Sequence, residues 1–496
     1  MTRKTRLRRM TKAISKFHGP MLAEIALTRL RQVEQRPLNE SRDWLPWYLL
    51  LIVKWAFEYG RLAAPARPAR EQDLIELMNE LHTAGDHSEF VGKGQVSAAR
   101  FMMQIAHQQF WWQRRLANWT LGRHVQLFGA LDDRRVMSAM FEAETGMKIE
   151  EFLELAVIVW GAIQAKPDVL SFTIESFMPL GVDSGPLTKF LSLVSRTPEE
   201  LQALLSKRKR AVRSLPGQLL EQTPFVRWPI IRRGDRYAPV AVRVFEEALR
   251  FWPYWTLRDA LDSEFTEEFG RVLERYVGQQ LRSLGLPVKG EKDLADPGAD
   301  ELAVDFCVEC QEGPVLLEVK SIQPSHRIKV HPSNELLASD LKSSVVKGVV
   351  QGFATAARLS GGEPGIGGKS AVPMLVIVTL GRLYMWNGGV AWDDWLGEAV
   401  LPKLEQRGID RGLIPPGRIF VLSIDDFDWL VHSCRTLSTS PFRRLEDVVE
   451  RNSELHGARF VIEDHLRADH ESQTPYEPLH SALDDLWKRA GRRLQP

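Results

Sequence analysis

The sequence predicts an α/β protein in which a large all-α N-terminal region precedes a module with a central mixed sheet. Three observations predict this fold class. Apolar residues recur every three or four positions through most of residues 1–215, which is the period of amphipathic helices. Two β-rich runs at 302–310 and 315–322 are separated by QEGP, as in a hairpin. Two later runs, at 371–380 and 417–424, are mostly apolar, which is typical of buried strands.

The chain is expected to contain two or three domains, because its 496 residues exceed the usual size of one. The pattern changes near Pro216, after which two short β-rich runs flank the turn signal RRGD. It changes again at Ser263, where an amphipathic helix is followed by strands, a second helix and two more strands. We therefore expect a helical sensor or recognition region at 1–215, a β-hairpin and connector at 216–262, the α/β module at 263–435, and a helical C-terminal extension at 436–496.

The composition is that of an ordinary globular protein, with 44% hydrophobic and 26% charged residues. The formal net charge of +1 argues against a chain-wide cationic surface, so contacts with nucleic acid must come from local basic segments. Three cysteines argue against a disulfide framework and indicate a reducing compartment. The apolar segment at 44–57 contains Lys54 and is too short to span a membrane. We expect a cytoplasmic protein without membrane contact.

Two helices of the α/β module are predicted from their own patterns. In the first, apolar residues form one stripe and Gly285 ends the helix. The second is predicted as one continuous helix from Asn334 to Leu359. The stripe of the first helix consists of Phe269, Val272, Leu273, Tyr276, Val277 and Leu281.

The strand VLLEVKSIQ at 315–323 carries two charges that are unusual in a buried strand. Side chains alternate along a strand, so Glu318 and Lys320 point to the same face. If the hairpin turns about residues 312 and 313, Asp305 lies opposite Lys320 and diagonal to Glu318, close enough for their side chains to converge. Two converging carboxylates favour a hard cation such as Mg²⁺, and a lysine beside them can stabilise negative charge or orient a water molecule. This combination predicts hydrolysis of a phosphodiester.

At these positions the sequence resembles the PD-(D/E)xK nuclease superfamily, which has the restriction-endonuclease-like fold. Asp305, followed across a hairpin by LLEVK, matches the D…ExK core of that family, with Val304 in the place of the family's proline. By the order of elements, the resemblance covers roughly residues 220–430. It implies that Asp305 and Glu318 bind Mg²⁺ or Mn²⁺ and that Lys320 assists the attacking water.

The same resemblance implies two site residues on helices. The family often supplies an acidic residue from the helix before the sheet; Glu274 matches that place, and Glu267, seven residues earlier, is a less favoured substitute. Some branches place a glutamine on the helix after the ExK strand, and Gln351 matches it. The implied catalytic residues are Asp305, Glu318, Lys320, Glu274 and Gln351, and the implied metal ligands are Asp305, Glu318 and Glu274.

Plainer interpretations compete with the catalytic one. An E-x-K on one strand face can be a surface ion pair worth about 0–1 kcal/mol. Cys307 and Cys310 have the spacing of a metal knuckle, but that spacing places them on opposite strand faces and predicts core residues. The segment EPGIGGKS at 363–370 imitates a phosphate-binding loop, yet it lies between a helix and a following strand, the reverse of the required order.

Local basic residues are candidates for contacts with the phosphate backbone of a nucleic acid. His326, Arg327 and Lys329 follow the ExK strand directly and are expected near the cleaved bond. Arg232 and Arg233, in the predicted hairpin ahead of the module, are further candidates.

The sequence therefore predicts a metal-dependent nuclease, with DNA favoured by the resemblance and RNA, including tRNA, as the alternative. A large helical region joined to a nuclease resembles bacterial anti-phage defence effectors in its architecture. This resemblance implies a protein trigger or inhibitor that contacts residues 1–215. The competing class is a catalytically inactive nuclease-fold module that binds nucleic acid or protein.

Overall fold

The computed structural model describes residues 2–85, 97–166, 170–211, 215–294, 303–330, 332–360, 372–454, 456–467 and 477–494. Within these ranges the N-terminal part is almost entirely helical, and a five-stranded sheet comes later in the chain. The α/β class is therefore confirmed. The glycine-rich segment at 363–370 lies outside the described residues.

A mixed sheet forms the centre of the later module, as predicted, in the strand order β4–β5–β6–β7–β8. The pairs β4–β5 and β5–β6 are antiparallel, whereas β6–β7 and β7–β8 are parallel. Parallel neighbours need long crossovers, and helices follow β6 and β7 in the chain. The strands are β4 (Val288–Gly290), β5 (Phe306–Glu309), β6 (Pro314–Lys320), β7 (Met374–Thr379) and β8 (Ile419–Ser423).

The register of the β5–β6 hairpin differs from the prediction. The observed pairing, extended by one residue beyond β5, places Asp305 level with Glu318. The expectation that Asp305 lies opposite Lys320 is therefore wrong. The reason is the connection, which takes four residues, 310–313, instead of a two-residue turn, so the chain reverses one residue earlier.

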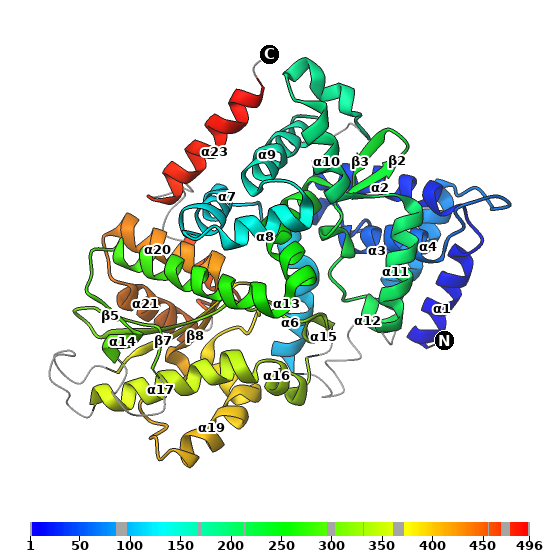
Figure 1. Cartoon of the computed structure of the whole chain (residues 1–496). Helices are drawn as coiled ribbons and strands as arrows, with labels where there is room; N and C mark the ends of the chain where they lie inside the picture. The colour runs from blue at the N-terminus through cyan, green and yellow to red at the C-terminus, as the bar shows by residue number, and fades with distance from the viewer. Residues whose placement is uncertain are drawn as a thin grey trace.

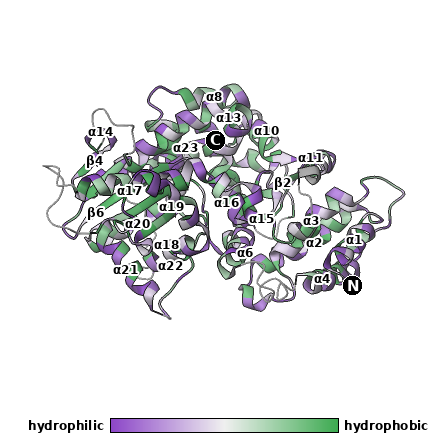
Figure 2. Ribbon diagram, turned by 90° about the horizontal axis from the view of Figure 1, so that it is seen from below, coloured by the Kyte–Doolittle hydropathy of each residue, from purple (hydrophilic) through white to green (hydrophobic). Residues whose placement is uncertain are grey.

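Helices cover both faces of the sheet, as Figure 1 shows. Helices α13 and α20 lie on one face, and α17 lies on the other with α19 packed against it. Neighbouring residues of β6 serve opposite faces: Leu317 joins the core around α13, and Leu316 joins the core around α17. Figure 2 shows the strands as a hydrophobic layer between the helices. The helices of this part are α13 (Val242–Arg282), α14 (Glu291–Leu294), α15 (His326–Val330), α16 (Asn334–Asp340), α17 (Lys347–Ser360), α18 (Gly388–Ala391), α19 (Gly397–Gln406), α20 (Ile424–Leu437), α21 (Pro441–Ser453) and α22 (Ile462–Arg467), with the π-helical turns η5 (Lys342–Val346) and η6 (Trp392–Leu396) and the short 3-10 turn η7 (Pro416–Arg418).

Helix α13 is longer than the amphipathic helix predicted from Ser263. It runs over 41 residues and changes direction at Asp262, whose φ of 36° and ψ of −99° are not helical. The second half is the predicted helix, and Gly285 follows its end with a φ of +71°, a backbone conformation that favours glycine. The predicted stripe is buried throughout: Phe269, Val272, Leu273, Tyr276, Val277 and Leu281.

The helix predicted over 334–359 is divided in the structure. Ser333 caps α16 with its side chain, and η5 separates α16 from α17. A π-helical turn contains more residues than an α-helical one, so it shifts the direction in which the following side chains point. Apolar residues within η5 and after it join one core: Val345, Val346, Val349, Val350 and Phe353 are all buried.

The N-terminal region is helical, as predicted, and much of it surrounds a core of its own that includes α1–α4 and α11. The hairpin predicted around RRGD is confirmed as β2 and β3, and β1 extends it in parallel. The elements here are α1 (Arg3–Ile14), α2 (Gly19–Glu34), η1 (Leu38–Glu40), α3 (Pro46–Tyr59), α4 (Glu71–Ala84), α6 (Ala98–Gln113), α7 (Asn118–Val125), η2 (Gln126–Ala130), α8 (Val136–Thr145), α9 (Ile149–Ala165), η3 (Ile174–Leu180), α10 (Ser184–Val194), β1 (Ser195–Arg196), α11 (Pro198–Ala211), α12 (Leu215–Gln218), η4 (Pro224–Val226), β2 (Ile230–Arg233) and β3 (Arg236–Pro239).

The helical region is packed onto the sheet module. Helices α7–α10 share one apolar core with α13 and one face of the sheet. Helix α6 reaches the other side, where Gln104 donates to the carbonyl of Val330 at 2.6 Å and Arg100 forms an ion pair with Asp394 at 2.8 Å. The C-terminal helix α23 (Leu479–Arg493) packs against α7 and α9 (Figure 1). The core therefore spans the chain from α7 to α23.

The apolar segment at 44–57 forms the buried helix α3, as predicted. Lys54 in this helix is buried and forms an ion pair with Glu221 at 2.5 Å, which offsets the cost of burying its charge. Among the described helices, none is both long and apolar enough to cross a membrane.

Candidate metal and nucleic-acid site

Asp305 and Glu318 are tied together across the β5–β6 hairpin. The N–H of Asp305 donates to Oε2 of Glu318 at 3.3 Å, and the N–H of Val319 donates to Oδ2 of Asp305 at 2.6 Å. The Glu318 carboxylate thus binds the backbone N–H of Asp305, and the Asp305 carboxylate binds the backbone N–H of the residue after Glu318. The Glu318 side chain is only 2% exposed, and Asp305 is half-buried. The structure brings the two predicted ligands together.

Lys320 completes the group by forming an ion pair with Oε1 of Glu318. Both residues lie on the same face of β6, as their spacing predicts. The Lys320 side chain is 17% exposed, so its ammonium lies between a buried carboxylate and the surface. Because Glu318 is buried, this is not the solvent-exposed ion pair of the plainer interpretation.

Glu274, on α13, lies near enough to the pair for its charges to be felt. It is half-buried, and the charges of Asp305 and Lys320 both act on its ionisation. Gly278, one turn later, lets the helix approach the sheet, because a Cβ there would lie 2.8 Å from Cζ of Phe306. Glu267, the less favoured substitute, is 71% exposed and pairs with Arg271.

The pKa values of Glu318, Glu274 and Asp305 are all raised. Burial, together with the nearby Asp305 carboxylate, raises the pKa of Glu318 to about 8 despite the ammonium of Lys320. Burial, Asp305 and Glu291 raise the pKa of Glu274 to about 7. Burial also raises the pKa of Asp305, against the N–H of Val319. Several perturbed carboxyl groups in one place are typical of a functional site.

Helix α17 packs against Glu318 and against the backbone that leads into Asp305. Gly348 faces Glu318, and a Cβ at that position would lie 3.1 Å from Cγ of Glu318. Gln351 donates from Nε2 to the carbonyl of Ala303 at 2.9 Å, and the hydroxyl of Thr355 accepts from the N–H of Val304 at 3.1 Å. The structure therefore places Gln351 against the backbone that leads into Asp305. Its amide has the geometry of a positioning residue.

The donor set suits a magnesium-type ion. Within the described ranges, no three or more His, Cys, Asp or Glu side chains are arranged as a ready-made metal site. Mg²⁺ is usually held by one or two carboxylates, with water and phosphate oxygens completing its shell. Asp305 and Glu318 provide those two carboxylates. A cation between them would also favour their charged forms, which burial opposes.

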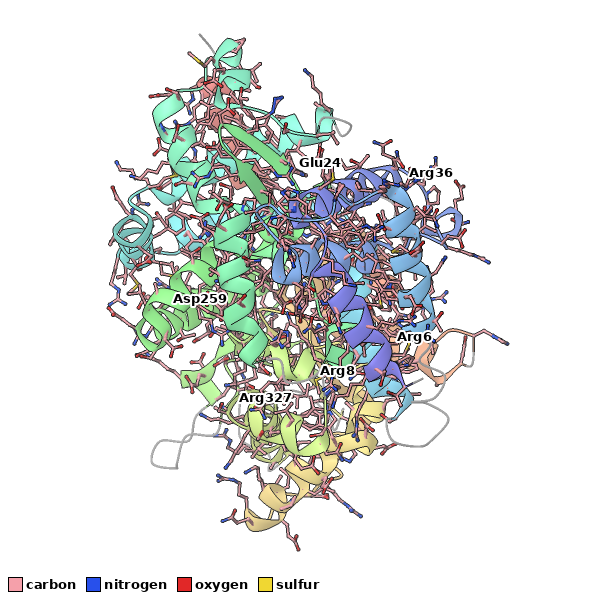
Figure 3. All side chains as sticks on the ribbon, turned by 90° about the vertical axis from the view of Figure 1, so that its right-hand side faces the viewer. Arg6, Arg8, Glu24, Arg36, Asp259 and Arg327 are labelled. Carbon is pink, nitrogen blue, oxygen red and sulfur yellow. The ribbon has the colours of Figure 1, made fainter. Side chains whose placement is uncertain are left out.

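The basic residues after β6 lie on α15 and beside it. Arg327 is exposed, and Figure 3 shows it on the lower part of the molecule. His326 contacts Oε1 of Glu221 through Nε2 at 3.1 Å, and Lys329 donates to Oε1 of Gln222 at 2.8 Å. Two of the three predicted phosphate contacts therefore bind the segment that precedes the β2–β3 hairpin.

Arg232 and Arg233 lie in a different part of the molecule, on β2 of the three-stranded sheet. Arg233 forms an ion pair with Glu24 at 2.8 Å and donates to the carbonyl of Pro20 at 2.7 Å. Figure 3 shows Glu24 far above Arg327. The structure does not bring the hairpin arginines to the Asp305–Glu318 group, because the hairpin packs on the N-terminal helices.

Sequence reasoning missed the residues that hold the site in place. Thr355 and Gly348 carry no charge and lie on the helix for which the sequence predicted a single site residue, Gln351. Their positions, four residues after and three before Gln351, fall on one helix face and were the available signal. Glu291, on α14, acts on the acids through its charge. The two cysteines were predicted as core residues: Cys307 is buried and Cys310 is half-buried.

Comparison with known proteins gives no assignment. No protein-family model, curated protein or solved structure matches the chain at a significant level. The interpretation of the site therefore depends on its own geometry.

Proposed function

We propose that this protein is a metal-dependent nuclease that hydrolyses phosphodiester bonds, with DNA as the favoured substrate. The observation that carries the proposal is the convergence of Asp305 and Glu318, with the ammonium of Lys320 bound to Glu318. Burying charged groups such as Glu318 and its lysine costs stability, so their presence at the centre of the sheet supports a functional role. The narrower assignment to a restriction-endonuclease-like fold is part of this proposal.

Each residue has a distinct role in the proposed reaction. Asp305 and Glu318 would hold Mg²⁺ or Mn²⁺, with Glu274 as a third carboxylate nearby. When bound, such an ion supplies positive charge to phosphate oxygens and lowers the pKa of a water molecule. Lys320 would orient the attacking water and stabilise negative charge that develops on the phosphate. Glu274, with a pKa of about 7, can exchange a proton near neutral pH.

Substrate cleavage by the purified full-length chain tests this proposal. Plasmid DNA and a mixed RNA are incubated separately with Mg²⁺, with Mn²⁺ and with EDTA. We expect cleavage with either metal, none with EDTA, and at least about a hundredfold loss in Lys320→Ala. Lys289→Ala is the matched control, because Lys289 lies on the neighbouring strand β4 and forms an ion pair with Glu309 at 2.7 Å.

If the purified wild-type protein cleaves neither substrate, the experiment is repeated in cells. Expression of wild type, Lys320→Ala and Lys289→Ala is induced, and total DNA and RNA are then sequenced for new ends. New ends in wild type and Lys289→Ala, but not in Lys320→Ala, support a nuclease that needs a cellular trigger. Equal behaviour of all three chains, in the tube and in cells, favours the inactive binding module. New ends confined to RNA, or to tRNA, would replace DNA by RNA as the substrate.

The biological setting proposed is bacterial anti-phage defence, in which the helical region contacts a protein trigger or inhibitor. Met103 of α6 packs in the core around α17, on the face of the sheet that carries Glu318, which gives such a contact a physical route to the site. Phage plaque counts on cells that carry wild type or Lys320→Ala test this setting. Equal plaque counts across a panel of phages would exclude the role in anti-phage defence but leave the proposed nuclease activity standing.

A further inference from the structure

A recess lies where the parallel strands β6 and β7 end, between these strand ends and helix α6. The segment after β6 provides Gln323 and the loop after β7 provides Arg382, while α6 provides His107 and Trp111. Its cavity volume is about 60 Å³. In α/β proteins, ligand sites commonly lie at the carboxyl ends of parallel strands.

Three buried nitrogen atoms of this recess make no hydrogen bond within the described part of the chain: Nε2 of His107, Nε1 of Trp111 and Nε2 of Gln323. His107 and Trp111 are 4% and 7% exposed. A buried donor without an acceptor costs about 1–3 kcal/mol. Three such atoms lining one recess therefore point to a ligand that brings acceptors.

Charged side chains of both signs surround the recess. Among the described residues, four cationic side chains and two carboxylates, Glu247 and Asp425, line it. Both carboxylates are bonded to Arg250, at 3.1 and 2.8 Å. A guanidinium has five donors, so these ion pairs fix its position while leaving N–H groups that can face the recess. The cationic side chains are Arg114, Arg250, Lys329 and Arg382.

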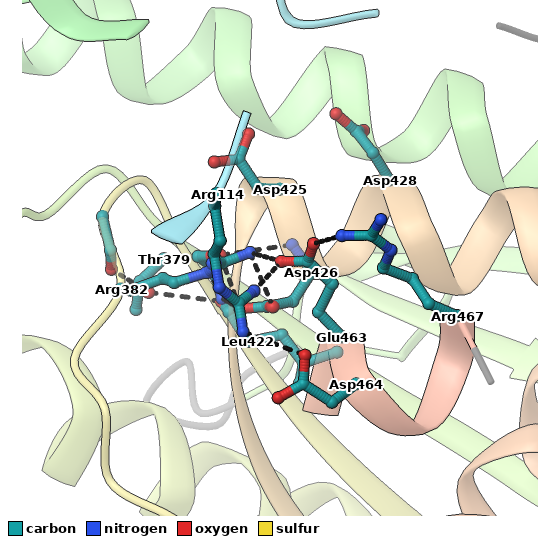
Figure 4. A network of polar contacts seen from close by, with 12 residues as sticks. Arg114, Thr379, Arg382, Leu422, Asp425, Asp426, Asp428, Glu463, Asp464 and Arg467 are labelled. Atoms are coloured by element: carbon teal, nitrogen blue, oxygen red, sulfur yellow. Dashed lines mark hydrogen bonds and ion pairs between the residues drawn. The ribbon is translucent and has the colours of Figure 1, made fainter. Parts of the chain in front are cut away.

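Arg114 and Arg382 are fixed by a network of ion pairs with acidic side chains, which Figure 4 shows. Arg382 pairs with Asp426 at 3.1 Å and also with Glu463, and Arg114 pairs with Glu463 and Asp464. These contacts preorganise the cations, which reduces the cost of ordering them on a ligand. The recess is therefore a built site rather than a chance gathering of surface charge.

The recess is too deep for a duplex phosphate to enter. The side chains of Arg114, Arg250 and Arg382 are only 12%, 11% and 13% exposed. Aromatic side chains also line it, among them Phe251, Trp255 and Tyr384, and such side chains can stack on a planar ring. Depth, donors and aromatic walls together fit a small molecule.

We propose that this recess binds a small phosphate-bearing ligand, whose oxygens accept hydrogen bonds from His107, Trp111 and Gln323. The ligand chemistry is a phosphate group, either free or as the end of a nucleotide. This proposal does not depend on the nuclease activity, because it concerns other side chains and needs neither a divalent metal nor a nucleic acid.

Calorimetric titration of the full chain tests it, in phosphate-free buffer with EDTA. The titrants are inorganic phosphate, adenosine monophosphate and a short DNA duplex. We expect phosphate or the nucleotide to bind more tightly than about 1 mM, and the duplex not to compete for this site. A nucleotide at least about tenfold tighter than phosphate indicates that the aromatic walls hold a base; equal affinities indicate the phosphate alone.

Gln323→Glu is the decisive variant. It keeps the Oε1 that accepts from Nε1 of Trp255 at 2.6 Å, but it replaces the unpartnered donor by an anionic oxygen. We expect affinity to fall at least about tenfold. Gln406→Glu, the same change at an exposed position of α19, should bind as wild type does. Circular dichroism and melting of both variants report whether they are folded.

Trp111→Phe serves if Gln323→Glu does not fold. It removes one N–H and keeps an aromatic ring, so affinity should fall about five- to thirtyfold. The proposal is overturned if neither phosphate nor the nucleotide binds below about 10 mM, or if the folded variants bind as tightly as wild type. Cleavage assays play no part in either outcome, so failure here leaves the proposed nuclease untouched.

Discussion

The N–H of Asp305 donates to Oε2 of Glu318 at 3.3 Å, which joins the residue at the start of one strand to a buried acid on the next. Val319 returns a hydrogen bond to Asp305 at 2.6 Å. The two carboxylates are thus fixed by backbone groups before any cation binds. Such preorganisation is what a catalytic metal site requires.

We predict that the stability of the metal-free protein depends on Glu318 in a pH-dependent way. The pKa of this carboxyl group is raised to about 8 in the folded chain from an ordinary 4.5. Between these values the folded state holds the proton more than the unfolded state does, so stability falls as pH rises. Melting in EDTA should show a smaller loss in Glu318→Gln than in wild type, because the raised pKa values of Glu274 and Asp305 still contribute in the variant.

Mg²⁺ should reverse that loss, because carboxylates bind the ion in their charged form. The rise in melting temperature on adding Mg²⁺ should be larger at pH 8.5 than at pH 6, by at least about 2 °C. Glu318→Gln should abolish the rise at both pH values. A rise of equal size in wild type and the variant would place the ion elsewhere.

Gly348→Ala should impair catalysis more than stability. The added Cβ would lie 3.1 Å from Cγ of Glu318 and 3.0 Å from Cδ1 of Ile377, so Glu318 must shift by a few tenths of an ångström. Alanine gains about 1 kcal/mol of helix propensity, which offsets the crowding. We expect a fall in kcat of about tenfold or more at nearly unchanged melting temperature.

Gly161→Ala is the control for that variant. Gly161 lies inside α9, and no described atom outside its own helix and chain neighbours lies within 4 Å of the position its Cβ would take. Activity should equal that of wild type, with a small gain in stability. If Gly348→Ala is as active as Gly161→Ala and wild type, Glu318 is insensitive to crowding from α17.

Thr355→Val should weaken the brace on the segment before Asp305. The hydroxyl of Thr355 is the acceptor for the buried N–H of Val304 at 3.1 Å, and valine leaves that N–H without it. We expect a loss of about 1–3 kcal/mol in the free energy of unfolding, with a lower kcat. Thr188→Val should change little, because its hydroxyl donates to its own helix at an exposed position.

Arg123→Met should be among the most destabilising single changes. Arg123 is buried and pairs with Asp425 at 2.6 Å and also with Asp428, so methionine leaves two buried acids without this partner. Denaturant unfolding should show a loss of about 3–5 kcal/mol. In the matched change Arg134→Met, the replaced side chain is 62% exposed and its partner Glu268 keeps an ion pair with Arg271, so the cost should be about 1 kcal/mol or less.

Local sequence patterns predicted several elements and the residues of the candidate site. The stripe from Phe269 to Leu281 and the alternation around Glu318 are local patterns, and local patterns follow from backbone periodicity. They predicted the second half of α13 and the strands β5 and β6, and they put Glu318 and Lys320 on one face, but not the first half of α13, which begins at Val242.

Only the tertiary structure decided which residues meet. The register of Asp305 depends on how many residues the loop at 310–313 uses, and sequence spacing leaves that count open. The contacts of Thr355 with Val304, and of Arg233 with Glu24, join segments 51 and 209 residues apart. Such partners are chosen by packing over the whole core, so hydrogen bonds between distant segments, and the recess at the strand ends, emerge only once the chain has folded.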